Sequence, residues 1–542
     1  MRHVRIGGFL CGLALLVWMM PAHAASAGLK THAQALTTPA TQRAALEQLR
    51  DLGDASVRPL LQALKEGALY HWQHHLYRFT AEGTFVDLDG QTLLDPSGAP
   101  LFPDDAEEVL LEEANIPLVQ RALDVLDLFH PDAAKRQATA RRLGHLPEAD
   151  ILPILEKAQA NETDPDVQAV VTEALNKLRL ASPEASVRIK AIQTFGANRA
   201  EAALSHLKAL APTEPDPAVQ TAIVDAVRSI ENYLKLRNIV GYVFNGVSLA
   251  SILLIMSLGL AITFGLMGII NMAHGEMLML GSYTAYVLQE FFISTFPGYL
   301  DYYFILALPL SILMVGGVGV LMERGILRFL YGRPLESLLV TWGIGMVLQQ
   351  GARLGFGDQT SVSPPTWFRG GWEVMHGLIF PYSRVFIIAL SILSLAIVYL
   401  LLHRSTIGLK IRSVMQNRDM AACMGISARK VDTFTFALGT ALAGLAGCAL
   451  SLIGTVDPEV GKTYIVDSFM VVVLGGVGKL FGTILASFGV GMSNKILEPL
   501  IPGTAAAVYA KVAILVLVIF FLQLKPTGLF PAKERMAAGA VR

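Results

Sequence analysis

The chain has 542 residues, of which 53% are hydrophobic and 16% are charged, and its formal net charge is −1. A charge so close to zero argues against binding to nucleic acid, which needs a basic surface. The average hides a division, because residues 25–235 are polar and typical of soluble helices whereas residues 239–524 are mostly apolar. We therefore predict an all-α protein in which a soluble domain precedes a polytopic membrane domain.

Residues 1–24 have the pattern of a secretory signal peptide. Arg2 and Arg5 give a basic start, residues 6–20 form a short apolar core, and Ala22-His23-Ala24 matches a cleavage site. Cleavage after Ala24 would place the following domain outside the cytoplasmic membrane. The alternative is an uncleaved anchor, for which the apolar core is short.

The soluble part, residues 25–235, contains an internal repeat. Residues 131–178 and 183–230 match at a shift of 52, and each reaches an Asp-Pro pair, Asp164-Pro165 and Asp216-Pro217. Asp can cap a helix and Pro fits its first turn. A period of this length is typical of stacked helix pairs in a solenoid, and the pattern resembles HEAT-type repeats. We expect an extracytoplasmic domain that binds partners and carries no catalytic site.

An insertion at about residues 67–115 interrupts the repeat. Alternation around Asp89-Gly90, within residues 84–94, predicts a small β-hairpin. Three histidines also lie here: His71, His74 and His75. No acidic residue or cysteine stands at convincing ligand spacing from them, so we expect surface histidines, no metal site and no cofactor.

The apolar part, which we place at residues 236–531, holds eight or nine candidate transmembrane helices. They lie at residues 241–268, 274–293, 302–322, 336–353, 384–402, 431–454, 465–478, 481–498 and 505–524. The seventh is short and rich in glycine, which is compatible with a re-entrant segment. Basic residues follow the third, fifth and last candidates, and the opposite loops are nearly bare. The positive-inside rule then places residue 236 outside and the tail, residues 532–542, in the cytoplasm.

The first two candidate spans are separated by polar residues. Asn271, His274 and Glu276 interrupt the apolar stretch 259–286. Lipid tolerates such side chains only where they face protein, water or a partner. We therefore predict a helix break that lines a translocation path; the alternative is a short turn in water.

A long basic loop, residues 403–430, follows the fifth candidate span. Arg418 to Gly425 predict a short helix with Met420 and Met424 on its apolar side, ended by Gly425. A permease driven by a separate motor needs such a lever. The alternative is a loop held by lipid head groups.

Several motifs are familiar together: GIINMAHGEMLMLGSY, the spacing N-x3-A-x3-GI after residue 416, ALAGLAG, VLGGVGKLFG and KPTGLF. They resemble the branched-chain amino acid type of ABC transporter permease over about residues 240–531. The resemblance implies a subunit of the bacterial inner membrane that works with a second permease, two cytoplasmic ATPases and an extracytoplasmic binding protein. A signal peptide followed by a helical domain is similar to the urea branch of the family, which implies urea as the substrate. Branched-chain amino acids and short amides are the alternatives.

The chain holds no Walker A motif, so we expect a transport subunit and not an enzyme. The candidate path residues are Thr263, Asn271, His274, Glu276, Ser282, Trp342 and Gln349. The candidate residues of the ATPase coupling loop are Arg412, Asn417, Arg418, Ala421, Gly425 and Ile426. A different class of function is a stand-alone channel or ion-coupled carrier with a regulatory solenoid. Its relay would have to use Glu276, Asp467 and Lys511, which is little for proton or ion coupling.

Overall fold

The computed structural model describes residues 25–52, 57–80, 83–96, 98–103, 105–145, 151–331 and 333–530. The expected signal peptide and the expected tail at 532–542 lie outside these residues. The chain divides into two compact units, residues 1–234 and 235–542, and each is described by itself. The fold is mostly helical, as the composition indicates.

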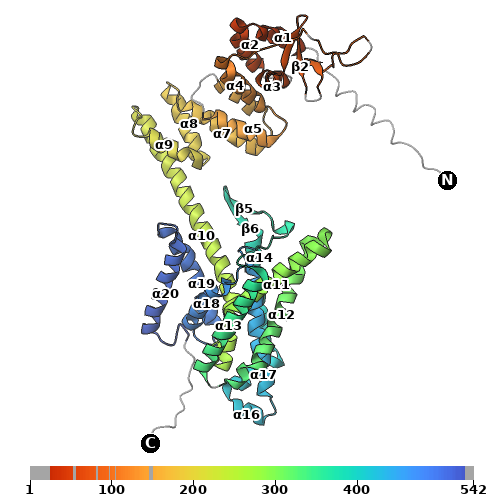
Figure 1. Ribbon diagram of the computed structural model, residues 1–542. Coiled ribbons are helices and arrows are strands. Elements are labelled where there is room, and N and C mark those ends of the chain that lie inside the picture. The colour runs from red at the N-terminus through yellow and green to blue at the C-terminus, as the bar shows by residue number, and fades with distance from the viewer. Residues whose placement is uncertain are drawn as a thin grey trace, which may run out of the picture. The chain divides into compact units, whose positions relative to one another are not determined.

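The first unit consists of helices and one small sheet (Figure 1). Its helices are α1 (Ala25–Gln34), α2 (Pro39–Leu52), α3 (Arg58–Glu66), α4 (Ile116–Asp127), α5 (Ala133–Leu143), α6 (Leu152–Asn161), α7 (Pro165–Arg179), α8 (Ala185–Ala197), α9 (Leu204–Leu210) and the start of α10 (Pro217–Met267). Three successive apolar clusters form its interior instead of one central core. This succession is what stacked repeats produce.

The period of 52 residues corresponds to three helices, which corrects the expectation of helix pairs. The starts of α5, α6 and α7 recur 52 residues later as the starts of α8, α9 and α10. Asp164 Oδ1 accepts a hydrogen bond from Asp166 N at 2.9 Å, and Asp216 Oδ1 accepts one from Ala218 N at 2.8 Å. The Asp-Pro pairs therefore cap α7 and α10 as predicted. The likeness to HEAT repeats stays a prediction.

An arginine in each repeat ties the helices together. Arg136 Nη1 donates to two backbone carbonyls, and its Nε and Nη2 lie 2.8 and 2.9 Å from the carboxylate of Glu162. Arg188 repeats the two carbonyl contacts one period later, and its Nη2 lies 2.8 Å from Glu214 Oε1, but its Nε has no hydrogen-bond partner among the described residues. Both carboxylates are buried, so these are internal ion pairs with a structural role.

The insertion forms an antiparallel sheet in the order β3-β2-β1-β4. Its strands are β1 (Leu69–Trp72), β2 (His75–Phe79), β3 (Phe85–Asp87) and β4 (Glu107–Glu108). The main hairpin is β1–β2, which turns through Gln73 and His74, both at positive φ. The predicted hairpin around Asp89-Gly90 shrinks to a turn closed by one bridge, Val86 to Thr92. Gln and His do not have the residue pattern of such turns, so the β1–β2 hairpin was missed.

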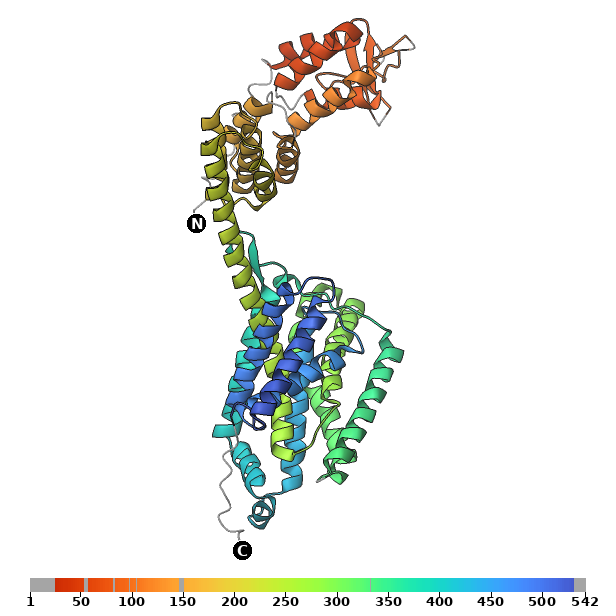
Figure 2. The ribbon, with the colours of Figure 1, turned by 90° about the vertical axis from the view of Figure 1, so that its left-hand side faces the viewer.

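The second unit is a bundle whose helices run side by side (Figure 2). They are the rest of α10, then α11 (His274–Thr295), α12 (Tyr303–Gly325), α13 (Pro334–Phe356), α14 (Tyr382–Arg404), α15 (Thr406–Gln416), α16 (Arg418–Cys423), α17 (Ala428–Leu450), α18 (Val460–Gly475), α19 (Leu480–Leu497) and α20 (Ala506–Leu524). A hairpin that the sequence did not indicate, β5 (Gly371–Met375) with β6 (Leu378–Pro381), precedes α14.

Within the described residues, six helices are long and apolar enough to cross a membrane, fewer than the eight or nine expected. They are most of α10, together with the whole of α12, α14, α17, α19 and α20. The other three expected spans coincide with α11, α13 and α18. The first two carry buried or partly buried polar side chains, and α18 has only 16 residues.

Glycines bring the central helices into backbone contact. A Cβ added at Gly281 of α11 would lie 2.0 Å from the carbonyl oxygen of Gly444 in α17. One at Gly275 would lie 2.5 Å from the carbonyl oxygen of Gly461 in α18. Only glycine permits helices to approach this closely. These contacts fix α11 against α17 and α18.

Candidate functional site

The helix break predicted between the first two spans is present. Helix α10 ends at Met267, Gly268 has a φ of +64°, and α11 begins at His274. Asn271 Oδ1 accepts a hydrogen bond from Ala273 N at 3.1 Å, which stabilises the turn into α11. Met272 N donates to Thr341 Oγ1 of α13 at 3.1 Å. The break is therefore tied to α13, and Asn271 and Ala273 within it are buried, whereas Gly268 is exposed.

Three polar side chains at the break are buried and incompletely paired. Asn271 and His274 have no exposed surface, and Glu276 is 8% exposed. His274 Nε2 lies 3.1 Å from the carbonyl oxygen of Met256, so it carries the proton and Nδ1 has a free lone pair. Within the described part of the chain, Asn271 Nδ2, His274 Nδ1 and Glu276 Oε2 have no hydrogen-bond partner.

These side chains do not converge on one point. His274 faces α10, where its ring also approaches Gly259. Glu276 faces α13, because a Cβ added at Gly345 would lie 3.1 Å from its carboxylate. Glycine at 345 therefore leaves room for the carboxylate. Of the three polar residues at the break, Glu276 is the one that lies at the interface between α11 and α13.

The remaining predicted path residues divide into two groups. Thr263 and Ser282 are buried but bond backbone carbonyls, so their hydroxyls are occupied. Trp342 is 55% exposed and does not join them. Gln349 is 6% exposed, and its Nε2 lies 3.5 Å from Glu459 Oε1. The structure thus brings Gln349 toward the same interface as Glu276.

Sequence reasoning missed the far end of this interface. Arg353 Nη2 lies 3.1 Å from Glu459 Oε1, although the residues are 106 positions apart. Gly345, Gln349 and Arg353 are spaced by four residues and so share one face of α13. An arginine inside an apolar stretch was the available signal. We call the set Glu276, Gly345, Gln349, Arg353 and Glu459 the polar lane.

The ionisable pair considered for an ion-coupled carrier is also placed. Lys511 Nζ of α20 lies 3.3 Å from Asp467 Oδ2 of α18, and it lies over the ring of Tyr464 at 5.6 Å. Asp467 is 3% exposed. The two charges compensate each other, and neither belongs to the polar lane. This arrangement does not form a relay with Glu276.

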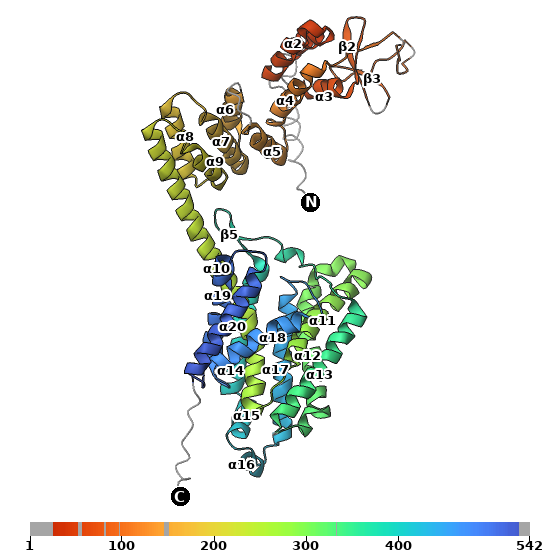
Figure 3. The same cartoon turned by 60° about the vertical axis from the view of Figure 1, so that its left-hand side comes forward.

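The predicted short helix in the loop is α16, which lies with α15 at one end of the bundle (Figure 3). Asn417 Oδ1 accepts from Asp419 N at 3.1 Å and from Met420 N at 3.0 Å, so it caps the helix. Gly425 follows with a φ of +81°, which favours glycine.

Part of the surface at α16 is exposed and apolar. Met420 is 61% exposed, Met424 is 79% exposed, and Ala421 is buried. Of the other predicted loop residues, Arg412 is exposed and Ile426 is half-buried, its N–H bonding the carbonyl of Ala421 at 3.0 Å. Exposed methionines on a short, capped helix are typical of a docking surface.

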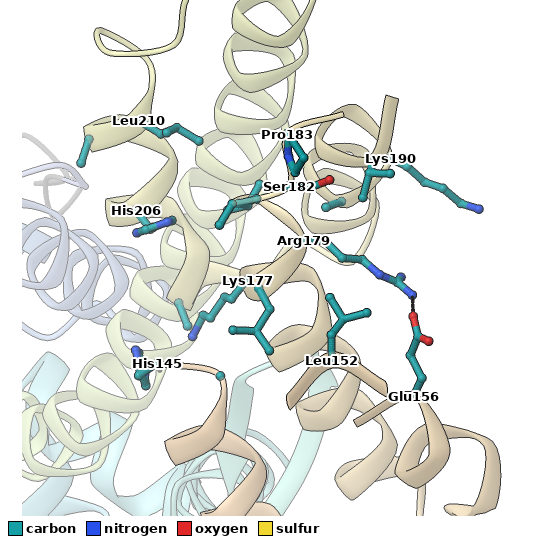
Figure 4. A pocket seen from close by; sticks show the side chains of 18 of the residues that line it. His145, Leu152, Glu156, Lys177, Arg179, Ser182, Pro183, Lys190, His206 and Leu210 are labelled. Carbon is teal, nitrogen blue, oxygen red and sulfur yellow. Dashed lines mark hydrogen bonds and ion pairs between the residues drawn. The ribbon is translucent and has the colours of Figure 1, made fainter. Parts of the chain in front are cut away.

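The first unit contains a cavity of about 1360 Å³ between α6, α7, α8 and α9 (Figure 4). Arg179 and Lys177, which line it, are paired with Glu156 at 2.6 Å and with Glu173 at 2.7 Å. No pattern in the sequence indicated this cavity. Because Arg179 and Lys177 are already in ion pairs, neither side chain has a free charge to offer a ligand in this cavity.

The bundle, its polar lane and the exposed short helix α16 are compatible with a membrane permease. The chain belongs to the branched-chain amino acid transport permease family: residues 242–522 match the family described as "Branched-chain amino acid transport system / permease component". It is therefore a multi-pass membrane protein. The match begins after the first unit.

Individual relatives match the same part of the chain. The high-affinity branched-chain amino acid transport system permease protein BraD of Pseudomonas aeruginosa is 27% identical over 54% of this chain and 95% of its own length. LivH of Escherichia coli K12 is 28% identical over 54% of this chain and 95% of its own length. LivM of the same organism is 27% identical over 46% and 62%. No solved structure gives a significant match.

Proposed function

We propose that this chain is a membrane subunit of an importer that receives its substrate from a separate extracytoplasmic binding protein. A second permease subunit completes the path, and two cytoplasmic ATPases drive it. The observation that carries the proposal is the polar lane, with the unpartnered Oε2 of Glu276, inside the family's permease region. The chain itself transports and does not hydrolyse ATP.

The buried carboxylate of Glu276 is costly without a function. An acidic residue at the centre of a span costs about 2.5–3.5 kcal/mol on insertion scales. Glu276 lies in the first turn of α11, so this figure is an upper bound for it. One of its oxygens has no partner among the described residues, so the protein satisfies this carboxylate only in part. A substrate that donates an N–H group would supply the missing hydrogen bond during passage.

Two substrate classes donate N–H groups in this way. Branched-chain amino acids are the leading candidates, because the relatives are named as permeases for them. Urea is the second candidate, since the family match leaves the first unit uncovered, and a signal peptide with a helical front domain characterises the urea branch. Either substrate would offer hydrogens to Glu276 and Gln349.

We assign α16 to the contact with an ATPase. Met420 and Met424 expose apolar surface on a helix that lies outside the candidate spans. A protein partner would bury this surface. The orientation from basic loops places α16 in the cytoplasm and residues 25–235 in the periplasm of a bacterial cell. N-terminal sequencing and protease access in spheroplasts test that placement.

Uptake measurements test the path. Cells that lack other uptake routes would receive the complete transporter with labelled leucine or labelled urea. We expect Glu276→Ala to reduce uptake of the true substrate about tenfold, while Glu290→Gln, an exposed residue of the same helix, leaves it unchanged. Normal uptake by Glu276→Ala would contradict the path. The substrate is the labelled compound, leucine or urea, that enters the cells and whose uptake is inhibited only by unlabelled compounds of the same class.

Co-purification tests the docking. We expect Met420→Asp with Met424→Asp to reduce the amount of ATPase that purifies with the membrane subunits, because charge opposes burial of that surface. Leu110→Asp, at a similarly exposed apolar position of the first unit, is the control for a general effect on expression. Unchanged ATPase recovery in the double variant would contradict the assignment of α16.

A further inference from the structure

Arg418 attaches the short helix α16 to the neighbouring helices. Its guanidinium pairs with Asp432 of α17, whose side chain is 4% exposed. The same guanidinium lies over the ring of Tyr331, 5.2 Å from its centroid. A planar cation can pair and stack at once, which an ammonium group does less well. Ala421 is the only buried residue of α16, which the structure describes throughout, so Arg418 contributes much of what holds the helix.

The contacts continue from Tyr331 into α12. Its hydroxyl donates to Glu323 Oε1 at 2.7 Å. Thr433 Oγ1 of α17 lies 2.6 Å from Glu323 Oε2 and 2.9 Å from the carbonyl of Arg429. A hydroxyl has only one hydrogen to donate, and a hydrogen bond to a charged carboxylate is stronger than one to a carbonyl. Thr433 therefore donates to Glu323. Burial and the hydrogen bond to Glu323 raise the pKa of Tyr331, so it stays a donor.

Both oxygens of Glu323 are therefore occupied, although the residue is only 2% exposed. This differs from Glu276, one oxygen of which has no partner in the part of the chain that the structure describes. A buried carboxylate with every acceptor used is suited to hold elements together and not to receive a substrate. We call Arg418, Asp432, Tyr331, Glu323 and Thr433 the clamp network.

The clamp network joins three elements that must move together if α16 is a lever. Helix α12 packs along α17 over much of its length, and α17 packs against α11, which carries Glu276. The network connects α16 to the ends of α12 and α17 nearest the loop. A displacement of α16 would therefore act directly on α12 and α17, both of which pack against α11.

We propose that the clamp network is a positioning device that converts movement of α16 into movement of α12 and α17. This inference rests on the proposed function, because it takes α16 as the ATPase contact. It assigns to Tyr331 and Glu323 a role separate from docking and from the path. Neither residue is on the exposed surface of α16, and neither belongs to the polar lane.

The test is the number of substrate molecules imported per ATP hydrolysed, measured with the complete complex in proteoliposomes. Tyr331→Phe removes one hydroxyl and keeps the ring. We expect it to lower that ratio about tenfold while ATPase subunits still co-purify, because a hydrogen bond to a buried charge is lost. Tyr299→Phe, the same change at an exposed tyrosine, should leave the ratio unchanged. Glu323→Gln, which keeps the shape, should resemble Tyr331→Phe.

A second measurement follows α16 directly. Cys423 lies on α16 and is exposed, whereas Cys448 is buried. The rate at which a maleimide labels Cys423 therefore reports on the mobility of the helix, and Cys423→Ser gives the background. We expect labelling to accelerate several-fold in Tyr331→Phe. Arg418→Lys, which keeps the charge beside Asp432 but not the stacking, should give an intermediate rate.

The outcomes separate this proposal from the proposed function. Wild-type ratios in both Tyr331→Phe and Glu323→Gln would overturn the clamp, as would faster labelling with no change in the ratio. Failure of the docking assignment appears elsewhere, as normal ATPase recovery with Met420→Asp and Met424→Asp. If Glu323→Gln does not insert, Tyr331→Phe alone decides, because it leaves both carboxylates in place.

Discussion

The two units of this protein treat buried charge differently. In the repeat unit, Arg136 and Glu162 use nearly all of their donors and acceptors on each other and on the backbone. In the membrane unit, Glu276 and His274 are at least as buried but each leaves one atom without a partner among the described residues. Satisfied pairs hold a fold, whereas an open buried acceptor is stable only if something else uses it.

The membrane unit also contains the satisfied kind, in the clamp network, so lipid surroundings alone do not explain the open atoms. The contrast is between positions. Three of the atoms without a partner among the described residues lie at the α10–α11 break, on Asn271, His274 and Glu276, and others lie elsewhere, such as Thr435 Oγ1 of α17. The carboxylate of Glu323, with both oxygens used, lies where α12, α16 and α17 meet. The comparison is therefore between the proposed substrate site and a structural joint within one bundle.

The largest effect should come from the backbone contacts that hold the membrane unit. Gly281→Leu would place a side chain where the carbonyl oxygen of Gly444 lies, so α11 could not pack on α17. We expect loss of the folded, detergent-soluble protein by size-exclusion chromatography. Gly317→Leu is the control, since that helical glycine has nothing within 4 Å of its Cβ position. Equal recovery of both variants would mean that α11 does not need this approach.

The internal ion pair of the repeat unit should show the next largest effect. Arg136→Ala leaves the buried carboxylate of Glu162 without its partner, which typically costs about 3–5 kcal/mol. We expect much faster proteolysis of the α5–α7 region in the full-length protein. The control is Arg141→Ala, which changes an exposed arginine of the same helix, and this variant should be cleaved at the wild-type rate. If Arg136→Ala is cleaved at the wild-type rate, fully paired buried charges do not stabilise the repeat unit as we infer.

Sequence reasoning found features whose signals are local. The Asp-Pro pairs cap their helices, Asn271 stands at the helix break, and the helix that begins at Arg418 ends before Gly425. In each case the deciding residues are within a few positions of one another. The helix count per repeat and the β1–β2 hairpin were not found, because Gln73 and His74 carry no turn signature.

Contacts between distant segments were beyond reach. Arg353 meets Glu459, and Glu323 meets Thr433, across more than 100 positions in each case. A single sequence does not say which face of a helix meets which neighbour. For the same reason, Gly345 was overlooked although it makes room for Glu276. The proposal of Trp342 for the path stays a prediction, and its side chain is 55% exposed.

Neighbouring glutamines of α13 sharpen the comparison within the polar lane. Gln349 is buried beside Glu459, and Gln350 is exposed. We expect Gln349→Leu to reduce uptake about fivefold through loss of roughly 1 kcal/mol of hydrogen bonding to a passing substrate. Gln350→Leu makes the same change one position on and should have no effect on uptake. If both variants transport normally, the lane ends at Glu276.

The smallest effect we expect is a pH dependence of the repeat unit. The hydrogen bond from Arg136, together with backbone N–H groups, holds the pKa of Glu162 below its usual 4.5. A carboxyl whose folded-state pKa is depressed stabilises the fold above its unfolded pKa, and this stabilisation is lost as pH falls through the folded value. Glu162→Gln removes the titration. We therefore expect the difference in pepsin cleavage between wild type and Glu162→Gln, mapped to α5–α7, to be constant near about pH 6 and to shrink toward about pH 3. Comparing the two proteins at each pH cancels the pH dependence of pepsin itself.

A cleavage difference that stays constant over the whole pH range would contradict this prediction. It would mean that Arg136 stabilises the charged and the neutral carboxyl of Glu162 equally. The contrast between Glu162 and Glu276 would then rest only on how many hydrogen-bond partners each carboxyl has.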